Sequence, residues 1–339
     1  MSASNPSFPP VQLRDLLDGW QLGRINSIRP HEGGSSGSNK YMVEATEGRF
    51  LLKGRPLKAL SAEQLEFMRV VMADCADAKL PVPDLRPQAN GLRHVEYQGL
   101  VWELQSWMSG RGGRRGNEDA SAAGLALAMF HRATRSRQIS NPKSCPHRHH
   151  FDRFIKRAIE NVPTAELTLR SLGNLATVAR AKVEERGISN HPQQTLHGDW
   201  HPRNLRFNEQ GRVCGILDFD GVRVDAVATE LANAVLQVSL RRSRKIPAKK
   251  WPAGIKHQAG QRLITAWRSR IGKAPPAETW GMLPWLMIEA VAGETILPIA
   301  IHGRVVGIDT LAWVEAGIRN AEWIRERSRA LGEALVPEG

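Results

Sequence analysis

The chain has 339 residues, 41% of them hydrophobic, which suits a globular protein with two lobes and a substantial core. It contains no run of about 18 uninterrupted apolar residues and no basic N-terminal segment followed by an apolar one, so neither a membrane span nor a secretory leader is expected. Its three cysteines lie far apart, as is typical of reduced thiols, and we therefore expect a cytoplasmic protein.

The formal net charge of +13 raises the question of nucleic-acid binding. Basic residues concentrate in the turn-rich segments 111–115 and 241–250. These segments lack interleaved stacking aromatics, and no helix-turn-helix or zinc-finger pattern accompanies them. Solvated loops are therefore favoured over nucleic-acid binding. Basic loops that steer a nucleotide or an acidic acceptor into a cleft are a further alternative.

The first hundred residues predict a small β-rich lobe. Segments 21–29, 41–45 and 49–53 are separated by turns and predict a three-stranded meander. Small residues fill the first turn: Gly33, Gly34, Ser35, Ser36 and Gly37. Because no Gly-Lys-Ser/Thr follows, this turn is not a Walker A loop. It predicts either a loop whose backbone amides approach phosphates or a flexible hairpin tip.

A helix and a second hairpin complete this lobe. The helix is predicted over 62–76, because Ser61 offers an N-cap and apolar residues share one face. Two prolines in the following LPVPDLRP stretch exclude helix and lead the chain into the next strand. The hairpin is predicted from 92–97 and 100–105, with Gly99 at its turn.

Beyond the second hairpin the pattern is mainly helical. Helices are predicted at 119–132, 151–160, 167–186, 280–288, 294–301 and 310–331. One intervening segment contains side chains that zinc accepts: Cys145, His147, His149 and His150. Their spacing fits no closed four-ligand site, so a surface loop is preferred there. The chain as a whole predicts an α+β fold.

Residues 197–220 read HGDWHPRNLRFNEQGRVCGILDFD and place polar side chains around two short apolar runs. The runs at 205–207 and 213–217 predict a hairpin that brings Asn204 and Asp218 together. An amide oxygen and a carboxylate are hard ligands of the kind that Mg²⁺ takes from proteins. The stretch therefore predicts a magnesium site.

Asp199 stands on a short turn in the same stretch. A carboxylate in such a place can orient an attacking hydroxyl and accept its proton. Together with the predicted magnesium site, this residue indicates phosphoryl transfer from a nucleotide to a hydroxyl.

The HGDxHxxN pattern, followed by the ILDFD segment, resembles the catalytic and metal-binding loops of the aminoglycoside phosphotransferase and choline kinase superfamily. That superfamily includes homoserine kinase-like enzymes, whose LPVP turn the present LPVP also resembles. The resemblance implies a protein kinase-like fold, with a nucleotide-binding lobe at 1–105, a catalytic and acceptor-binding lobe at 106–339 and a hinge at about 103–110. It also implies ATP and Mg²⁺ as cofactors.

The resemblance assigns roles within the central stretch. Asp199 becomes the catalytic base, Asn204 and Asp218 hold magnesium, and His197 braces the loop. Arg203 is expected to add positive charge beside the transferred phosphate.

The resemblance also assigns roles in the β-rich lobe. Lys53 would contact the nucleotide phosphates and pair with an acid of the following helix, with Glu66 preferred over Glu63. Ser36 and Gly37 would lie in the loop that approaches the phosphates.

In the hinge, backbone groups near Glu103 and Gln105 would bind the adenine edge, and Trp107 or Met108 would flank the ring. Core packing is the alternative for both Trp102 and Trp107.

Two further acids and a histidine complete the set. Glu230, in an ELANAV segment that resembles an anchoring element of the superfamily, is expected to accept hydrogen bonds from the catalytic loop. Asp220 is expected to tune the metal site indirectly, and His131 to bond within the core.

The sequence thus predicts an ATP- and magnesium-dependent phosphotransferase that moves the γ-phosphate to a hydroxyl of a small molecule such as an aminoglycoside, an amino alcohol or a sugar. A non-catalytic nucleotide-binding regulator and a basic nucleic-acid-binding protein are the alternatives. A protein side chain is disfavoured as acceptor, because no activation segment is recognisable between Asp220 and Glu230. No motif in the C-terminal third identifies the acceptor.

Overall fold

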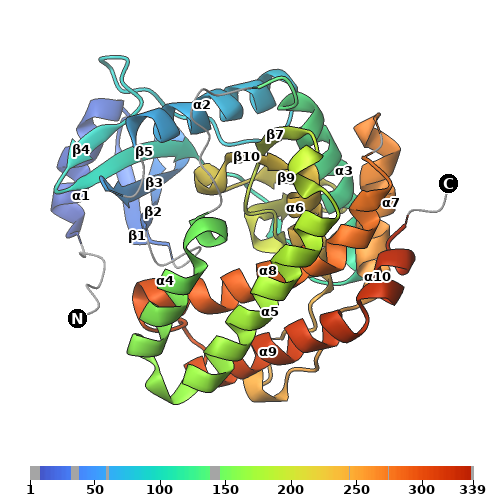
Figure 1. Ribbon diagram of the computed structural model, residues 1–339. Coiled ribbons are helices and arrows are strands. Elements are labelled where there is room, and N and C mark those ends of the chain that lie inside the picture. Colours follow the sequence, from blue (N-terminus) through green and yellow to red (C-terminus); the bar gives the residue numbers. More distant parts are fainter. Residues whose placement is uncertain are drawn as a thin grey trace.

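The computed structural model describes residues 8–31, 38–58, 61–137, 146–243, 245–273 and 275–336, and for residues 146–150 it describes the backbone alone. Figure 1 shows a β-rich lobe built from the N-terminal part of the chain and a larger helical lobe built from the rest. The predicted α+β fold with two lobes is confirmed.

The β-rich lobe is a five-stranded antiparallel sheet with the strand order β1-β2-β3-β5-β4. Its strands are β1 (Ile25–Pro30), β2 (Asn39–Ala45), β3 (Gly48–Pro56), β4 (Val95–Tyr97) and β5 (Leu100–Ser106). Apolar side chains such as Leu52 and Trp102 are fully buried in its core. Full burial of Trp102 confirms the core-packing alternative for this tryptophan.

Helix α1 (Pro10–Leu17) is absent from the sequence-based prediction, yet it completes this core. Its buried Leu13 and Leu17 pack with Trp20 against the sheet. The indole Nε1 of Trp20 donates to the carbonyl of Arg86, at 2.9 Å, and so ties the N-terminal segment to the chain that leads into the second hairpin.

Helix α2 (Ala62–Asp77) begins one residue after Ser61, as predicted. The Ser61 hydroxyl accepts from the Gln64 amide and the Gln64 side chain accepts from the Ser61 amide, so the two form a capping box. The apolar face of α2 belongs to the hydrophobic core of the helical lobe. The division of the chain into lobes at 105/106 therefore stays a prediction. Helix α2 precedes this boundary in the sequence, but its apolar face packs in the core of the lobe that follows the boundary.

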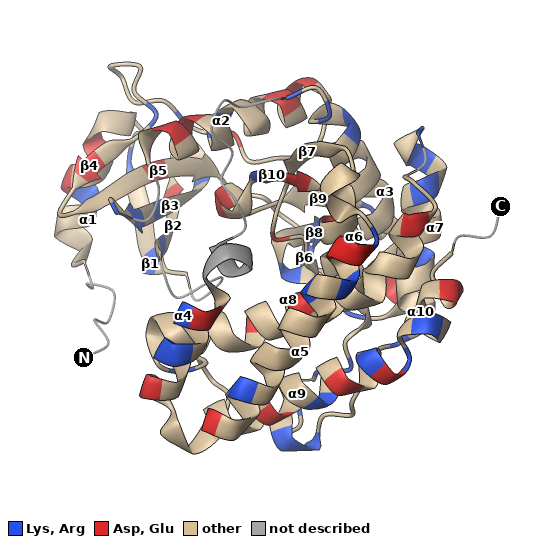
Figure 2. Ribbon diagram, viewed as in Figure 1, with Lys and Arg blue, Asp and Glu red and all other residues tan. Residues whose placement is uncertain are grey.

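The helical lobe consists of α3 (Asn117–Ala133), α4 (Pro146–Asn161), α5 (Glu166–Glu185), α6 (Val227–Ser239), α7 (His257–Ile271), α8 (Glu278–His302), α9 (Thr310–Glu326) and α10 (Ser328–Ala334). In Figure 2, both basic and acidic residues occur on α5, α9 and α10. Both signs on the same helices are typical of a solvated surface.

Helix α8 corrects the prediction of two separate helices at 280–288 and 294–301. It runs unbroken through Pro284 and Pro298, and most of its residues between the prolines are buried. Tertiary burial here outweighs the helix-breaking tendency of Gly and Pro. Conversely, the single helix predicted at 310–331 is divided into two helices, α9 and α10.

Among the described residues, α8 is the helix whose length and composition would allow it to cross a membrane. However, 61% of its apolar window is buried inside the protein. Figure 1 shows it surrounded by α4, α5, α6 and α9, in the position of a core helix.

Two small sheets carry the loops between the lobes. Strand β7 (Gln193–Leu196) pairs with β10 (Arg223–Ala226), and β6 (Arg111–Gly112), β8 (Leu205–Phe207) and β9 (Val213–Ile216) form the other sheet. The hairpin predicted from strands 205–207 and 213–217 is confirmed to within one residue. It places the two ends of the central motif side by side.

Candidate active site

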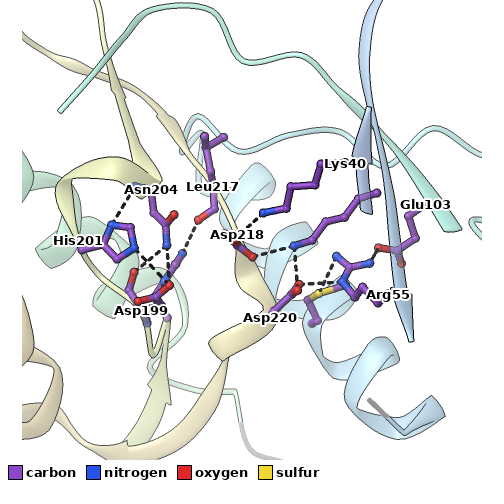
Figure 3. A network of polar contacts seen from close by, with 12 residues as sticks. Lys40, Arg55, Glu103, Asp199, His201, Asn204, Leu217, Asp218 and Asp220 are labelled. Carbon is purple, nitrogen blue, oxygen red and sulfur yellow. Dashed lines mark hydrogen bonds and ion pairs between the residues drawn. The ribbon is translucent and has the colours of Figure 1, made fainter. Parts of the chain in front are cut away.

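The β8–β9 hairpin brings the predicted metal ligands together. The amide of Leu217 donates to the carbonyl of Asn204, at 2.8 Å, so Asn204, just before β8, lies close to Asp218, just after β9 (Figure 3). The juxtaposition predicted from the hairpin is therefore confirmed.

Asp199 is fixed by its own loop. Nδ2 of Asn204 donates to Oδ2 of Asp199, at 2.9 Å, and to its backbone carbonyl, at 3.0 Å. Nδ1 of His201 accepts from the Arg203 amide, at 3.1 Å, so the ring hydrogen is on Nε2, which lies 3.5 Å from Oδ2 of Asp199. The Asp199 carboxylate is thus oriented from two directions, while 49% of its side chain stays exposed.

The charge state of Asp199 follows from these neighbours. Burial by the surrounding protein would raise the pKa of this carboxyl, but the His201 imidazole lowers it below the usual value. Asp199 is therefore ionised at neutral pH and can accept a hydrogen bond from a hydroxyl.

His197 links the loop to the end of β9. The ring is fully buried, Nδ1 accepts from the Asp199 amide, at 3.3 Å, and Nε2 donates to the carbonyl of Leu217, at 3.0 Å. Burial lowers the pKa of His197, so the ring stays neutral and keeps one donor and one acceptor. The predicted bracing role of His197 is confirmed.

Glu230, in α6, anchors the same loop by accepting hydrogen bonds from its backbone. It accepts from the amides of His197, at 3.1 Å, and Gly198, at 2.6 Å, and from Nε2 of His131, at 2.8 Å. Nδ1 of His131 in turn accepts from the Trp267 indole, at 3.0 Å. Both predictions, the anchoring role of Glu230 and the structural role of His131, are confirmed.

The backbone conformation and close packing at Gly198 explain why the motif needs a glycine at this position. Its φ of +81° lies in the left-handed region, and a Cβ at this position would lie 1.9 Å from the carbonyl oxygen of Gly221. The side chain of Arg223 also donates to the Gly198 carbonyl, at 2.9 Å. The backbone before Asp199 is therefore held against the segment that follows Asp218.

On the other side of the cleft, Asp218 is surrounded by cations. Its φ of +65° places a non-glycine residue in the left-handed region, an arrangement found at functional sites. Its carboxylate lies 2.7 Å from Nζ of Lys53 and 3.2 Å from Nζ of Lys40. Burial would raise the pKa of Asp218, but the two lysines hold it far below its usual range.

Lys53 does not pair with helix α2, contrary to the prediction. Its buried ammonium instead bridges Asp218 and Asp220, at 2.7 and 2.9 Å. The side chain of Glu66 is 67% exposed, and Glu63 is exposed as well. The reason is the register of α2, which turns its apolar face inward and leaves both acids facing solvent.

The buried acid of this region is Glu103, in β5. Its fully buried carboxylate accepts from Arg55, at 2.6 Å, and from Arg69 of α2, at 2.9 Å. Arg55 also contacts Asp220, at 2.9 Å, so a chain of alternating charges runs from Asp218 to Arg69. A charged residue inside an apolar strand was the signal that could have revealed this role.

The backbone role predicted for Glu103 and Gln105 at the adenine edge stays a prediction. Both residues lie inside β5, where they pair across the sheet with Lys53 and Leu51. Ser36 and Gly37, predicted to approach the phosphates, lie outside the described residues.

An open cavity of about 880 Å³ lies where β5 leads into the helical lobe. Its lining includes Trp107, Met108 and Cys214, and the Trp107 ring stands edge-on to His31 with ring centroids 5.4 Å apart. That Trp107 or Met108 flanks a nucleotide ring stays a prediction.

A second cavity, of about 540 Å³, begins at Asp199 and extends into the helical lobe. Arg203, predicted to add positive charge, lines this cavity and is exposed. Asp199 therefore stands between the cations that surround Asp218 and a cavity that can hold a second molecule.

The residues present fit a hard divalent cation. Because Nδ2 of Asn204 donates to Asp199, its Oδ1 is the atom left to accept a cation, next to the ionised Asp218. Within the described ranges, no cluster of three or more His, Cys, Asp or Glu forms a closed metal site. A cation held by two protein ligands needs further oxygens, which nucleotide phosphates supply.

Comparison with known proteins agrees with this geometry. A family model described as the phosphotransferase enzyme family matches residues 27–271. A homoserine kinase of Caulobacter vibrioides (strain NA1000 / CB15N) is 23% identical over 228 residues, which cover 65% of this chain and 68% of that protein.

Solved structures show the same fold. A microcompartment-associated aminopropanol kinase has a TM-score of 0.71 at 16% identity, covering 96% of this chain and 99% of that one. An amicoumacin kinase in complex with AMP-PNP and Ca²⁺ has a TM-score of 0.71 at 10% identity, covering 94% of each chain. A choline kinase of Cryptosporidium parvum has a TM-score of 0.65 at 10% identity, covering 96% of each chain.

The predicted resemblance to these kinases is confirmed, since the family model spans more than half of the chain and the fold agrees over nearly all of it. The chain therefore belongs to the phosphotransferase enzyme family and is a small-molecule kinase.

Proposed function

We propose that the protein transfers the γ-phosphate of ATP, with Mg²⁺, to a hydroxyl of a small molecule that occupies the cavity of about 540 Å³. The observation that carries this proposal is the position of Asp199, between that cavity and the lysines that surround Asp218. AMP-PNP and Ca²⁺ in the amicoumacin kinase structure support a nucleotide and a divalent cation as its partners.

The transfer needs little covalent chemistry from the protein. The acceptor oxygen forms a bond to the γ-phosphorus as the bond from that phosphorus to the β,γ-bridging oxygen breaks, and ADP leaves. The ionised Asp199 accepts a hydrogen bond from the hydroxyl and takes its proton as the new ester forms. Since the pKa of Asp199 is lowered, its main contribution is to orient the hydroxyl rather than to remove its proton early.

The donor side supplies charge. Lys53 and Lys40 would neutralise phosphate oxygens, and Asn204 and Asp218 would hold the cation. When bound, Mg²⁺ would offset negative charge on the phosphates. Asp220 would keep Lys53 in place, because it contacts the same ammonium at 2.9 Å.

The first experiment measures ADP formation from ATP by the full chain, with and without Mg²⁺, against a panel of hydroxyl compounds that includes aminoglycosides, amino alcohols and sugars. We expect acceptor-dependent ADP release that EDTA abolishes. Asp218→Ala should remove metal-dependent nucleotide binding, whereas Asp15→Ala, which removes an exposed acid of α1, should leave it unchanged. Nucleotide binding without transfer to any acceptor would favour the non-catalytic regulator instead.

A further inference from the structure

The cavity next to Asp199 is rich in arginine. Five arginines line it, against three acids, although each acid has a partner within the described protein. The arginines are Arg115, Arg203, Arg223, Arg242 and Arg304. Two of them come from the basic segments 111–115 and 241–250, so these two segments, far apart in the sequence, meet at one cavity.

Arg115 is held by hydrogen bonds to uncharged groups of Gln237 rather than by an ion pair. It is partly buried. Its guanidinium donates to the backbone carbonyl of Gln237, at 2.8 Å, and to the side-chain Oε1 atom of Gln237, at 3.2 Å. No carboxylate of the described residues forms an ion pair with it. By contrast, Arg111 and Arg114 of the same segment pair with Asp119 and Glu118.

Arg242 faces the same cavity with its orientation fixed. Glu294 accepts from its Nη1, at 3.0 Å, and the guanidinium stacks over the Trp313 ring, 4.5 Å from the centroid. Its Nε is buried and meets no hydrogen-bond acceptor among the described residues. Stacking and one ion pair therefore hold a planar donor group at the cavity wall.

The electrostatics of this group are unfavourable for the protein alone. Burial, followed by repulsion from Arg242, lowers the pKa of Arg115 to about 10. A partly buried guanidinium without a carboxylate partner costs stability unless an anion compensates it. Carboxylates and phosphates match the forked donors of arginine, which is why arginine clusters bind them.

We propose that the phosphoryl acceptor carries a carboxylate or phosphate group, which Arg115 and Arg242 bind in the cavity that Asp199 also lines. This inference rests on the proposed function, since it assigns the substrate class of the same site. Helix α8 contributes apolar side chains to the wall, among them Leu286, Ala290, Leu297 and Ile301. An acceptor that fits is therefore a hydroxyl compound with an anionic group and an apolar part.

The test measures binding rather than turnover. Glycerol, D-glycerate and glycerol 3-phosphate share a three-carbon backbone and differ in the anionic group, and choline serves as a cationic probe. Each is titrated calorimetrically into the full chain, saturated with Mg²⁺ and a non-hydrolysable ATP analogue so that the phosphate site is filled. We expect at least one of the two anions to bind more tightly than glycerol and choline, and the pair shows whether carboxylate or phosphate is preferred.

Variants locate that binding. Arg115→Gln and Arg242→Gln should each weaken anion binding roughly 10- to 100-fold, because each removes a charged donor. Arg329→Gln removes the same charge from a side chain that is 93% exposed on α10, and it should change nothing. Melting temperature and nucleotide affinity show that each variant is folded. Anions that bind no better than glycerol, or equally well to Arg115→Gln and Arg242→Gln, would overturn the inference.

Turnover separates this inference from the proposed function. Transfer by the wild type only to cationic or neutral hydroxyl compounds would refute the anionic acceptor and leave the kinase activity intact. Absence of transfer to any acceptor would count against the kinase activity, while the anion site would still stand or fall by the titrations.

Discussion

The two sides of Asp199 handle charge in opposite ways. On the donor side, cations and carboxylates alternate from Lys40 and Lys53 through Asp218 and Asp220 to the arginines around Glu103. On the acceptor side, arginines outnumber acids, and Arg115 has no carboxylate partner among the described residues. In the protein alone, the donor-side cations are thus paired with carboxylates, whereas Arg115 on the acceptor side forms no ion pair with the described residues and matches an anionic group of the acceptor.

The two sides thus differ in what their charged residues do: some stabilise the fold, and others are placed to bind a ligand. Glu103 is fully buried between two arginines, so it stabilises the packing of α2 against the sheet. Arg115 and Arg242 are held by an amide, a carbonyl, a carboxylate and a ring, which fix their positions without cancelling both charges. The following predictions test where the boundary between the two kinds of charge lies.

The largest effect is expected at Asp199, which faces both sides. Asp199→Asn keeps the shape of the side chain but removes the ionised acceptor for the hydroxyl proton, so kcat should fall about 10²- to 10⁴-fold. Nucleotide affinity should be retained, because Asp199 lies outside the ion pairs of the lysines. Steady-state kinetics and nucleotide titration measure the two quantities.

The matched control for this change is Asp84→Asn, at an exposed position in the loop after α2. It should leave kcat unaltered. Full activity in Asp199→Asn would exclude Asp199 as the catalytic base.

The next effect concerns two glutamates that both lie near Arg69. Glu103→Gln removes a fully buried charge and leaves two arginines facing each other, which should cost about 3 kcal/mol of unfolding free energy. Glu66→Gln removes a mostly exposed charge 3.7 Å from Arg69 and should cost less than about 0.5 kcal/mol. Urea unfolding measures both.

The same two variants also test which acids orient Lys53. If Glu66 rather than the aspartates oriented Lys53, Glu66→Gln would lower nucleotide affinity. An unchanged affinity in this variant, together with a destabilised Glu103→Gln, would agree with the observed ion pairs.

The catalytic loop gives a pH-dependent prediction through Glu230. Burial would raise the pKa of Glu230, but the interactions with His131, His197 and the Gly198 amide together outweigh it and lower the pKa in the folded protein. The resulting stabilisation is present above the unfolded pKa of about 4.3 and is lost as the pH falls through the lower folded pKa. Glu230→Gln should therefore cost about 2 kcal/mol at pH 7.

Urea unfolding at pH 7, 5, 4 and 3 measures this difference between wild type and Glu230→Gln. It should stay constant from pH 7 to 5 and shrink at pH 4 and 3. A difference that grows on acidification would show that the ionised carboxylate does not anchor the loop.

The sequence defines the donor side well because its parts are close in the chain or follow local rules. The hairpin between Asn204 and Asp218 follows from two apolar runs and a turn, and the cap at Ser61 follows from a serine before an apolar face. The partner of Lys53 could not be predicted in this way, because it depends on which face α2 turns to the sheet.

The acceptor side is harder to predict, because its charges converge from distant segments. Arg115 precedes α3 and Arg242 follows α6, and each segment alone has the composition of a solvated basic loop. Helix α8, which forms the apolar wall, was predicted as two helices, since the burial that carries it through Pro298 is a tertiary effect.

The smallest effect tests how far the donor side depends on a remote cap. Ser61→Ala removes the hydroxyl that accepts from the Gln64 amide and should destabilise α2 by about 1 kcal/mol. Because α2 carries Arg69, which contacts Glu103, a small loss of nucleotide affinity should accompany this change. Ser61→Asp retains an acceptor at the cap and should restore both quantities, as measured by urea unfolding and nucleotide titration. Loss of stability with unchanged affinity would show that Glu103 and Arg55 hold the donor side without help from the start of α2.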